Sequence, residues 1–174
     1  FRDYPNRFSL IYDYCYFTGL IEEHEQTLTI TNKGEERLQH DWREEPTNFY
    51  SIWLKLYKGP IPNLQTIVYW LQLLCKRWTT LTSLYDALKN LLSAYYFDSP
   101  RDIWSQRIIQ MMMHLGLLQV GEDDEHGSVV RISPFGDSII SGTYVPEEEV
   151  IQLEIPSEPS DGHMTSTSIL PQLH

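Results

Sequence analysis

The chain has few cysteines, few basic residues and no long apolar run. Its 174 residues include two cysteines, Cys15 and Cys75, and each falls on a predicted apolar helix face. Buried, reduced thiols are therefore expected, which favours a reducing compartment. The sequence also lacks a secretory signal and a stretch long enough to cross a bilayer. These absences predict a cytoplasmic protein that is not associated with membranes.

The patterns of common catalytic and metal sites are missing as well. The histidines show no pair at metal-ligand spacing on a shared helix face. No glycine-rich loop precedes a helix, and neither a nucleophile elbow nor a Cys-x-x-Cys motif occurs. Two acidic clusters, 22–25 and 122–125, lack the spaced ligands and the glycine of a calcium loop, so we interpret them as solvated hairpin tips. The sequence therefore predicts a protein that is not an enzyme and needs neither metal nor cofactor.

Basic residues are scarce and unevenly distributed. Thirteen Lys and Arg stand against 24 Asp and Glu, which gives a formal net charge of −11. Residues 1–60 hold seven basic and ten acidic residues, 61–121 hold five and three, and 122–174 hold one and eleven. The acidity therefore lies mainly after residue 121, and the centre of the chain is mildly basic. This distribution repels nucleic acid at long range but leaves room for a local basic face.

The clearest pattern that is present lies between residues 102 and 141. Apolar residues recur at helical spacing over 102–115 and define one face: Ile103, Trp104, Ile108, Met111, Met112 and Leu115. Gly116 is expected to end this helix in a left-handed conformation. Strands at 117–120 and 129–132 then form a hairpin with an acidic tip over 121–127. Ser133 is expected to cap a further helix, with Pro134 at its first position.

The same order of elements occurs earlier in the chain. A helix over 6–17, a glycine, a hairpin over 20–30 and a helix from Thr31 to about Gln39 repeat it, with five fewer residues in the hairpin tip. We interpret the repeat as an internal duplication of a structural unit. The alternative is two unrelated pieces that share an order of elements.

Helices are also predicted between the two copies. The first copy's last helix is expected to continue to Trp42, Pro46 to follow its end, and Thr47 to cap the next helix. After a loop over 58–62, a helix begins at Asn63 with an apolar side made of Leu64, Ile67, Val68, Leu71, Leu74 and Cys75. A short strand over 78–80 and a helix that starts at Thr82 or Ser83 follow.

The aromatic residues are assigned mainly to the core. Four tryptophans fall beside apolar helix positions, so core packing is favoured over base stacking for Trp53, Trp70, Trp78 and Trp104. Tyr95 and Tyr96 lie in a loop over 94–100 and are expected to be exposed. His114, on the apolar helix, is interpreted as a core or surface histidine rather than a ligand.

Together these elements predict a mainly α fold with small β hairpins (α+β), arranged as tandem winged-helix domains of which the first is incomplete. Residues 63–142 supply the complete order of a winged helix, and residues 1–46 supply only its second half. Residues 47–62 form a connecting helix and loop. Residues 143–174 form an acidic tail with an edge strand near 150–155, followed by disordered or tag-derived residues. The start at Phe1 and the incomplete first unit suggest a piece of a longer protein.

Several short motifs resemble the accessory region of bacterial XPB-type helicase-like proteins. They are Trp78-Thr79-Thr80-Leu81 before a leucine-rich helix, the helix opened by Asp102-Ile103-Trp104 and closed by His114-Leu115-Gly116, and the segments 132–136 and 150–155. The resemblance covers about residues 28–155. It implies tandem winged helices placed beside a motor module, whose own motifs do not occur in this chain.

The function predicted from these features is a non-catalytic module that docks on proteins within a DNA-processing or DNA-associated, helicase-associated assembly. The alternative is a winged-helix transcription regulator that inserts the 102–115 helix into the major groove. The candidate contacts with nucleic acid or a partner are Arg101, Ser105, Gln106, Arg107, Gln110, Lys76, Arg77 and Lys89. The hairpin tip offers Glu122, Asp123, Asp124 and Glu125 where a DNA-binding wing needs cations. The acidic wing therefore predicts weak duplex DNA binding, if any, and places protein docking first.

Overall fold

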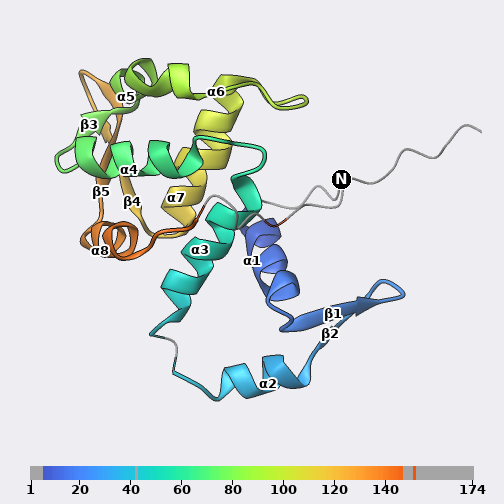
Figure 1. Ribbon diagram of the computed structural model, residues 1–174. Helices are drawn as coiled ribbons and strands as arrows, with labels where there is room; N and C mark the ends of the chain where they lie inside the picture. Colours follow the sequence, from blue (N-terminus) through green and yellow to red (C-terminus); the bar gives the residue numbers. More distant parts are fainter. Residues whose placement is uncertain (1–5, 42, 147–150, 152–174) are drawn as a thin grey trace, which may run out of the picture.

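The computed structural model describes residues 6–41, 43–146 and 151, and it shows a mixed α+β protein (Figure 1). The first part holds α1 (Asn6–Phe17), β1 (Ile21–His24), β2 (Thr27–Ile30), α2 (Asn32–Leu38) and α3 (Glu45–Tyr57). The second part begins with α4 (Leu64–Leu74), β3 (Thr79–Thr80), α5 (Leu81–Leu88) and a 3-10 turn, η1 (Lys89–Leu91). It continues with α6 (Pro100–Asp102), the π-helix η2 (Ile103–Ile109), α7 (Gln110–His114), β4 (Leu118–Asp123), β5 (Gly127–Ile132) and α8 (Pro134–Gly142).

Within the described ranges, two small antiparallel sheets lie at separate places in the fold. β1 and β2 form a two-stranded sheet, whereas β5 lies between β3 and β4 in a sheet of order β3-β5-β4. In this second sheet Thr79 pairs with Val130, and Leu118 pairs with Ile132. Helix α3 runs between the part that carries α1 and α2 and the part that carries α4 to α8 (Figure 1).

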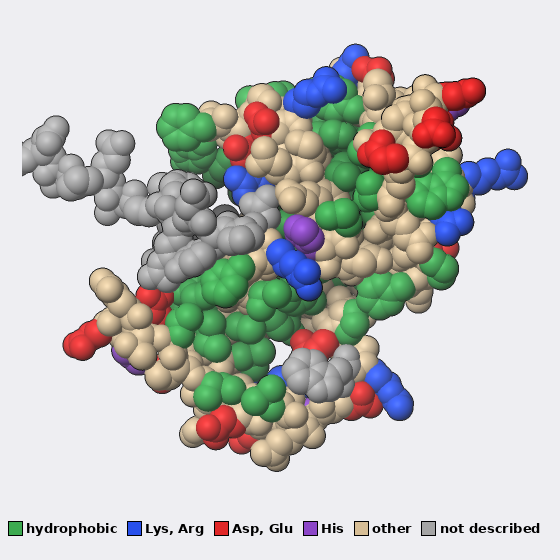
Figure 2. All heavy atoms as spheres, turned by 180° about the vertical axis from the view of Figure 1, so that it is seen from behind, with side chains coloured by type: hydrophobic (Ala, Val, Ile, Leu, Met, Phe, Trp, Pro, Cys, Tyr) green, Lys and Arg blue, Asp and Glu red, His purple; other side chains and the backbone are tan. Residues whose placement is uncertain are grey.

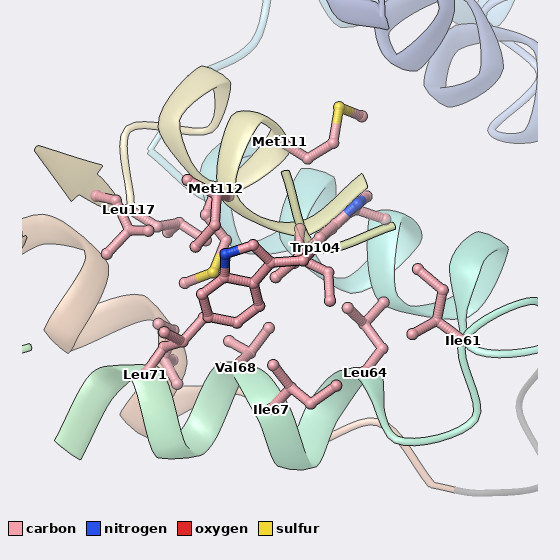
Figure 3. Packing of buried hydrophobic residues seen from close by; sticks show 14 of the residues in the cluster. Ile61, Leu64, Ile67, Val68, Leu71, Trp104, Met111, Met112 and Leu117 are labelled. Atoms are coloured by element: carbon pink, nitrogen blue, oxygen red, sulfur yellow. The ribbon is translucent and has the colours of Figure 1, made fainter. Parts of the chain in front are cut away.

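One hydrophobic cluster connects the described elements. Trp104, 4% exposed, lies beside the inward row of α4 and beside Met112, while Met111 points away from α4 (Figure 3). The Trp104 ring also meets Tyr85 edge-on at 5.9 Å between ring centroids. Leu10 of α1 and Trp53 of α3 belong to the same cluster. The first part of the chain is therefore packed on the second through α1 and α3.

The two predicted copies end their first helix in the same way. Gly19 and Gly116 have φ angles of 72° and 73°, and both follow the last turn of a helix. The next residues, Leu20 and Leu117, each donate their backbone N–H to a carbonyl five residues earlier at 2.8 Å. This is the hydrogen-bond pattern that lets a glycine close a helix C-terminus.

The junction between hairpin and following helix is also repeated, atom for atom. Thr31 donates its backbone N–H to the Leu20 carbonyl at 3.0 Å, and Ser133 donates to the Leu117 carbonyl at 2.9 Å. Each hydroxyl also bonds the glycine that ends the preceding helix, at 2.7 and 2.6 Å. Each then caps its own helix by accepting the N–H of the third residue on. These shared contacts support the interpretation of a duplicated unit.

Several predicted element boundaries were wrong. α2 ends at Leu38 rather than near Trp42, and α3 begins at Glu45 rather than after Thr47. Pro46 lies in the first turn of α3, where its missing N–H has no helical partner to lose. α5 starts at Leu81 because the Thr80 hydroxyl accepts the Ser83 N–H. The predicted tail lies outside the described residues over 147–150 and 152–174.

The long helix over 100–114 contains a π-helical segment that the sequence did not predict. The Gln110 N–H bonds the carbonyl of Ser105, five residues earlier. The wider turn changes the angular spacing, so Ile108 and Ile109 are both buried, at 0% and 6% exposure. The predicted apolar face of this helix is confirmed for Ile103, Trp104, Met111 and Met112, which are buried, whereas Leu115 at its end is half-buried.

Two tryptophans and one leucine were placed in the core incorrectly. Trp70, Leu74 and Trp78 are 44%, 42% and 48% exposed, whereas Trp53 and Trp104 are buried as predicted. The wide apolar arc of α4 exceeds the face that its neighbours cover, so Leu74 lies on the outer side. The predicted exposure of Tyr95 and Tyr96 is confirmed, at 38% and 69%. Cys75 is a buried free thiol, and burial raises its pKa to about 11; Cys15 is a half-buried free thiol.

Candidate interaction surfaces

The predicted contact residues of the 102–115 helix lie along its outer side, but their charges are already used within the fold. Arg107 donates its Nε to a carboxylate oxygen of Asp98 at 3.0 Å. The Arg101 guanidinium lies over the Tyr85 ring, 5.2 Å from its centroid. Ser105 donates its hydroxyl to the Arg101 carbonyl at 2.9 Å, while Gln106 is exposed and Gln110 is half-buried. A guanidinium in such contacts must exchange partners before it can neutralise a phosphate.

Two of the three predicted basic contact residues outside this helix are also paired within the fold. Lys76 pairs with Asp137 at the start of α8, and this contact lowers the pKa of the Asp137 carboxyl. Lys89 pairs with Asp86 at 2.9 Å. Arg77 is exposed beside Lys76. The structure therefore gathers little positive charge that is not already paired on the face proposed for DNA.

The acidic hairpin tip is shorter than predicted and fully solvated. β4 continues through Asp123, so only residues 124–126 form the turn. Glu122, Asp123, Asp124 and Glu125 are all exposed. Asp123 accepts the N–H groups of Glu125 and His126 at 3.1 and 2.9 Å, and bonds with His126 lower the pKa of its carboxyl. The predicted solvated tip is confirmed by the exposure of these four carboxylates.

A different surface, an apolar groove, was not predicted. A cavity of about 480 Å³ lies between α1, the β1–β2 hairpin, α2 and the first turns of α3, and α7 and α8 close it from the other part of the chain. We call it the α1–α2 groove; its apolar lining includes Ile11, Ile30, Leu38, Phe49, Leu115 and Phe135. Four of these side chains are 44–61% exposed, namely Ile11, Ile30, Leu38 and Phe135. Hydrophobic side chains gather around α1, the hairpin and α2 in the view from behind (Figure 2).

A small polar cluster forms one wall of the α1–α2 groove. Glu45, in the first turn of α3, accepts a hydrogen bond from the Tyr14 hydroxyl and pairs with Arg37 of α2. Burial, followed by the bond to Glu45, raises the pKa of Tyr14, so the phenol stays protonated. The cluster ties α1, α2 and α3 together and holds the groove open between them. It leaves the remainder of the wall to apolar side chains.

Helix α1 also covers part of the helix proposed to read DNA. α1 contacts both α3 and α7. Burial of its Asp13 raises the carboxyl pKa from 3.8 to about 6. Burial, followed by the charge of Asp13, raises the pKa of Tyr57, and the positive charge of Arg107 opposes that effect. The C-terminal half of the 102–115 helix is therefore partly enclosed by the first unit.

The sequence contained a signal for the α1–α2 groove, but it did not identify it. Ile30 and Leu38 each lie among polar residues in a strand or helix pattern, and an apolar residue in such a pattern normally indicates burial. The sequence could not show that no described element covers them, because coverage depends on the path of α3. His114 lies at the end of α7 and lines the groove, half-buried.

Comparisons with protein-family models, with curated proteins and with solved structures found no match. Among the described residues, no group of three His, Cys, Asp or Glu side chains is placed to hold a metal ion. None of the helices within the described ranges combines the length and apolar character needed to cross a membrane. The proposed function is therefore argued from the surfaces described above.

Proposed function

We propose that this chain is a non-catalytic, tandem winged-helix module that docks on a protein partner within a DNA-associated assembly, such as a helicase-associated complex. The order of elements from α4 to α8 supports the winged-helix assignment, as does the central position of β5 between β3 and β4. The repeated junctions at Gly19 and Gly116 support the assignment of a shorter, first unit in residues 6–38, ahead of the second unit formed by α4 to α8.

The observation that carries the docking proposal is the exposed lining of the α1–α2 groove. Ile11, Ile30 and Leu38 are 45%, 47% and 61% exposed around a cavity of about 480 Å³. Contiguous exposed apolar surface of this kind is typical of protein-binding sites. Duplex DNA cannot use such a surface, because its outer face is a row of charged phosphates.

The alternative function, a DNA-binding regulator, has weaker support. Arg101, Ser105 and Gln106 are exposed on the 102–115 helix and are suitable side chains for reading bases. The wing beside that helix carries four exposed carboxylates, however, and their negative charges repel a nearby phosphate unless salt screens them. Docking is therefore the primary function, and DNA contact is at most weak.

A photo-crosslinking experiment tests docking directly. A photoreactive amino acid replaces Leu38 in the groove or, as a matched control, Asp86 on the exposed side of α5. In cells that carry the protein, Leu38 should yield one abundant protein adduct and Asp86 should not. Equal adduct patterns from both positions would reject docking at the groove. Sub-micromolar, sequence-dependent binding of a duplex at physiological salt would instead favour the regulator.

A further inference from the structure

We propose that the α1–α2 groove binds an amphipathic helix of the partner protein, with aliphatic side chains on one face and lysine or arginine on its flanks. This inference rests on the proposed docking function and names the chemistry of the occupant. It follows from two independent observations. The first is that helices cover the equivalent apolar positions of the second unit, and the second is the charge of the residues around the groove.

The second unit shows what a covered face looks like. Matching the helix-ending glycines and the capping hydroxyls pairs three positions between the units, namely Ile11 with Ile108, Leu28 with Val130 and Ile30 with Ile132. In the second unit these residues are 0%, 0% and 6% exposed. In the first unit their counterparts are 45%, 46% and 47% exposed. Among the described residues, the first unit therefore presents the apolar face of a core that no helix covers in the way that α4 and α5 cover the second unit.

Helices α4 and α5 provide the cover in the second unit. α4 contacts α8, and α5 contacts β5. The inward row of α4 has aliphatic residues at i, i+3, i+4 and i+7, all at 0% exposure: Leu64, Ile67, Val68 and Leu71. A helix with this spacing is also the form in which partner proteins fill apolar grooves. The occupant of the α1–α2 groove should therefore be a helix with the same anchor spacing.

The charge around the groove specifies the flanks of that helix. Residues 6–45 hold nine Asp and Glu against four Lys and Arg. Three of the four cations are used internally: Lys33 donates to the Thr18 carbonyl, Arg37 pairs with Glu45, and Arg43 pairs with Asp41. Glu35 and Glu36 are exposed on α2, within one turn of Leu38. A partner with basic flanks is favoured here, since complementary charge increases association rate and specificity.

Two synthetic helical peptides test the inference with the full chain. Both carry leucines at i, i+3, i+4 and i+7 and a fluorescent label; one has lysines on its flanks and the other has glutamates. In anisotropy titrations at low salt, the lysine peptide should bind at least about fivefold more tightly, and the difference should shrink at high salt. The substitution Leu38→Glu should weaken its binding at least about tenfold. The matched control Leu73→Glu, on the exposed side of α4, should leave binding unchanged.

The outcomes separate failure of this inference from failure of docking itself. No binding of either peptide, equal affinity for both flanks, or equal effects of the two substitutions would overturn the inference about the helix. If Leu38 still forms a specific adduct in the crosslinking experiment, docking stands and the occupant is of another kind. If the molecular mass of the protein in solution rises with protein concentration and Leu38→Glu lowers it, a second copy of the chain is the occupant. That result would also overturn the inference.

Discussion

Replacing Gly136 by alanine should destabilise the protein more than any other small change in α8. A Cβ atom at this position would lie 2.3 Å from the Leu117 carbonyl oxygen and 2.6 Å from the Leu117 Cα. Both are backbone atoms of a residue that is 1% exposed, so no rotamer change can relieve the overlap. The N-terminus of α8 would have to move away from the chain at Leu117.

The size of the effect follows from the contacts that this movement breaks. Ser133 donates its N–H to the Leu117 carbonyl at 2.9 Å and its hydroxyl to the Gly116 carbonyl at 2.6 Å. Each such hydrogen bond contributes about 0.5–1.5 kcal/mol. The packing of Ile140, 7% exposed, would loosen as well. We expect a loss of about 2–4 kcal/mol, a large share of the roughly 5–15 kcal/mol that stabilises a typical domain.

Urea denaturation followed by tryptophan fluorescence measures this loss. Gly142→Ala is the matched control, because it lies at the other end of the same helix with no heavy atom within 4 Å of the added Cβ. The control should be neutral or slightly stabilising, since alanine has less backbone freedom to lose on folding. Gly34→Ala should repeat the large effect, as its Cβ would lie 2.2 Å from the Leu20 carbonyl oxygen. A Gly136→Ala variant within about 0.5 kcal/mol of the original protein would refute the reasoning.

Three further measurements test other parts of the structure. Trp104→Ala should destabilise by about 3–5 kcal/mol, because the ring is buried against α4 and Tyr85; an unchanged melting temperature would contradict this. Asp13→Asn should stabilise by about 1–2 kcal/mol at pH 8, after allowance for partial solvent screening. The pKa of Asp13 in the folded protein, about 6, exceeds its ordinary value of 3.8, so the Asp13 carboxyl favours folding below pH 4. This contribution is lost as the pH rises through 6. Equal stabilities of the original protein and Asp13→Asn at pH 8 would refute this reasoning. Duplex DNA should bind no more tightly than about 10⁻⁴ M at physiological salt, and neutralising the four wing carboxylates should strengthen binding only if the 102–115 helix faces DNA.

Local chemistry explains why the repeated junctions could be predicted from the sequence. Gly116 and Gly19 take positive φ, and Ser133 and Thr31 cap the following helices, because these residue types satisfy backbone groups at a helix end wherever they occur. The π-helical turn could not be predicted in the same way. Apolar spacing at 103–109 fits an α-helix nearly as well, and the choice between the two is made by packing against neighbouring helices.

The sequence by itself determined the local elements: two helix–hairpin–helix units, the helices between them, and an acidic tip at residues 122–125. The reason is that hydrophobic periodicity, caps and glycines act within a few residues of one another. Only the tertiary structure decided which apolar residues are covered. Ile30 and Ile132 occupy equivalent positions, yet one is 47% exposed and the other 6%, because α4 and α5 pack on the second unit and no described helix covers the first in that way. The α1–α2 groove is the consequence, since burial depends on where distant elements pack and not on the residues that are to be buried.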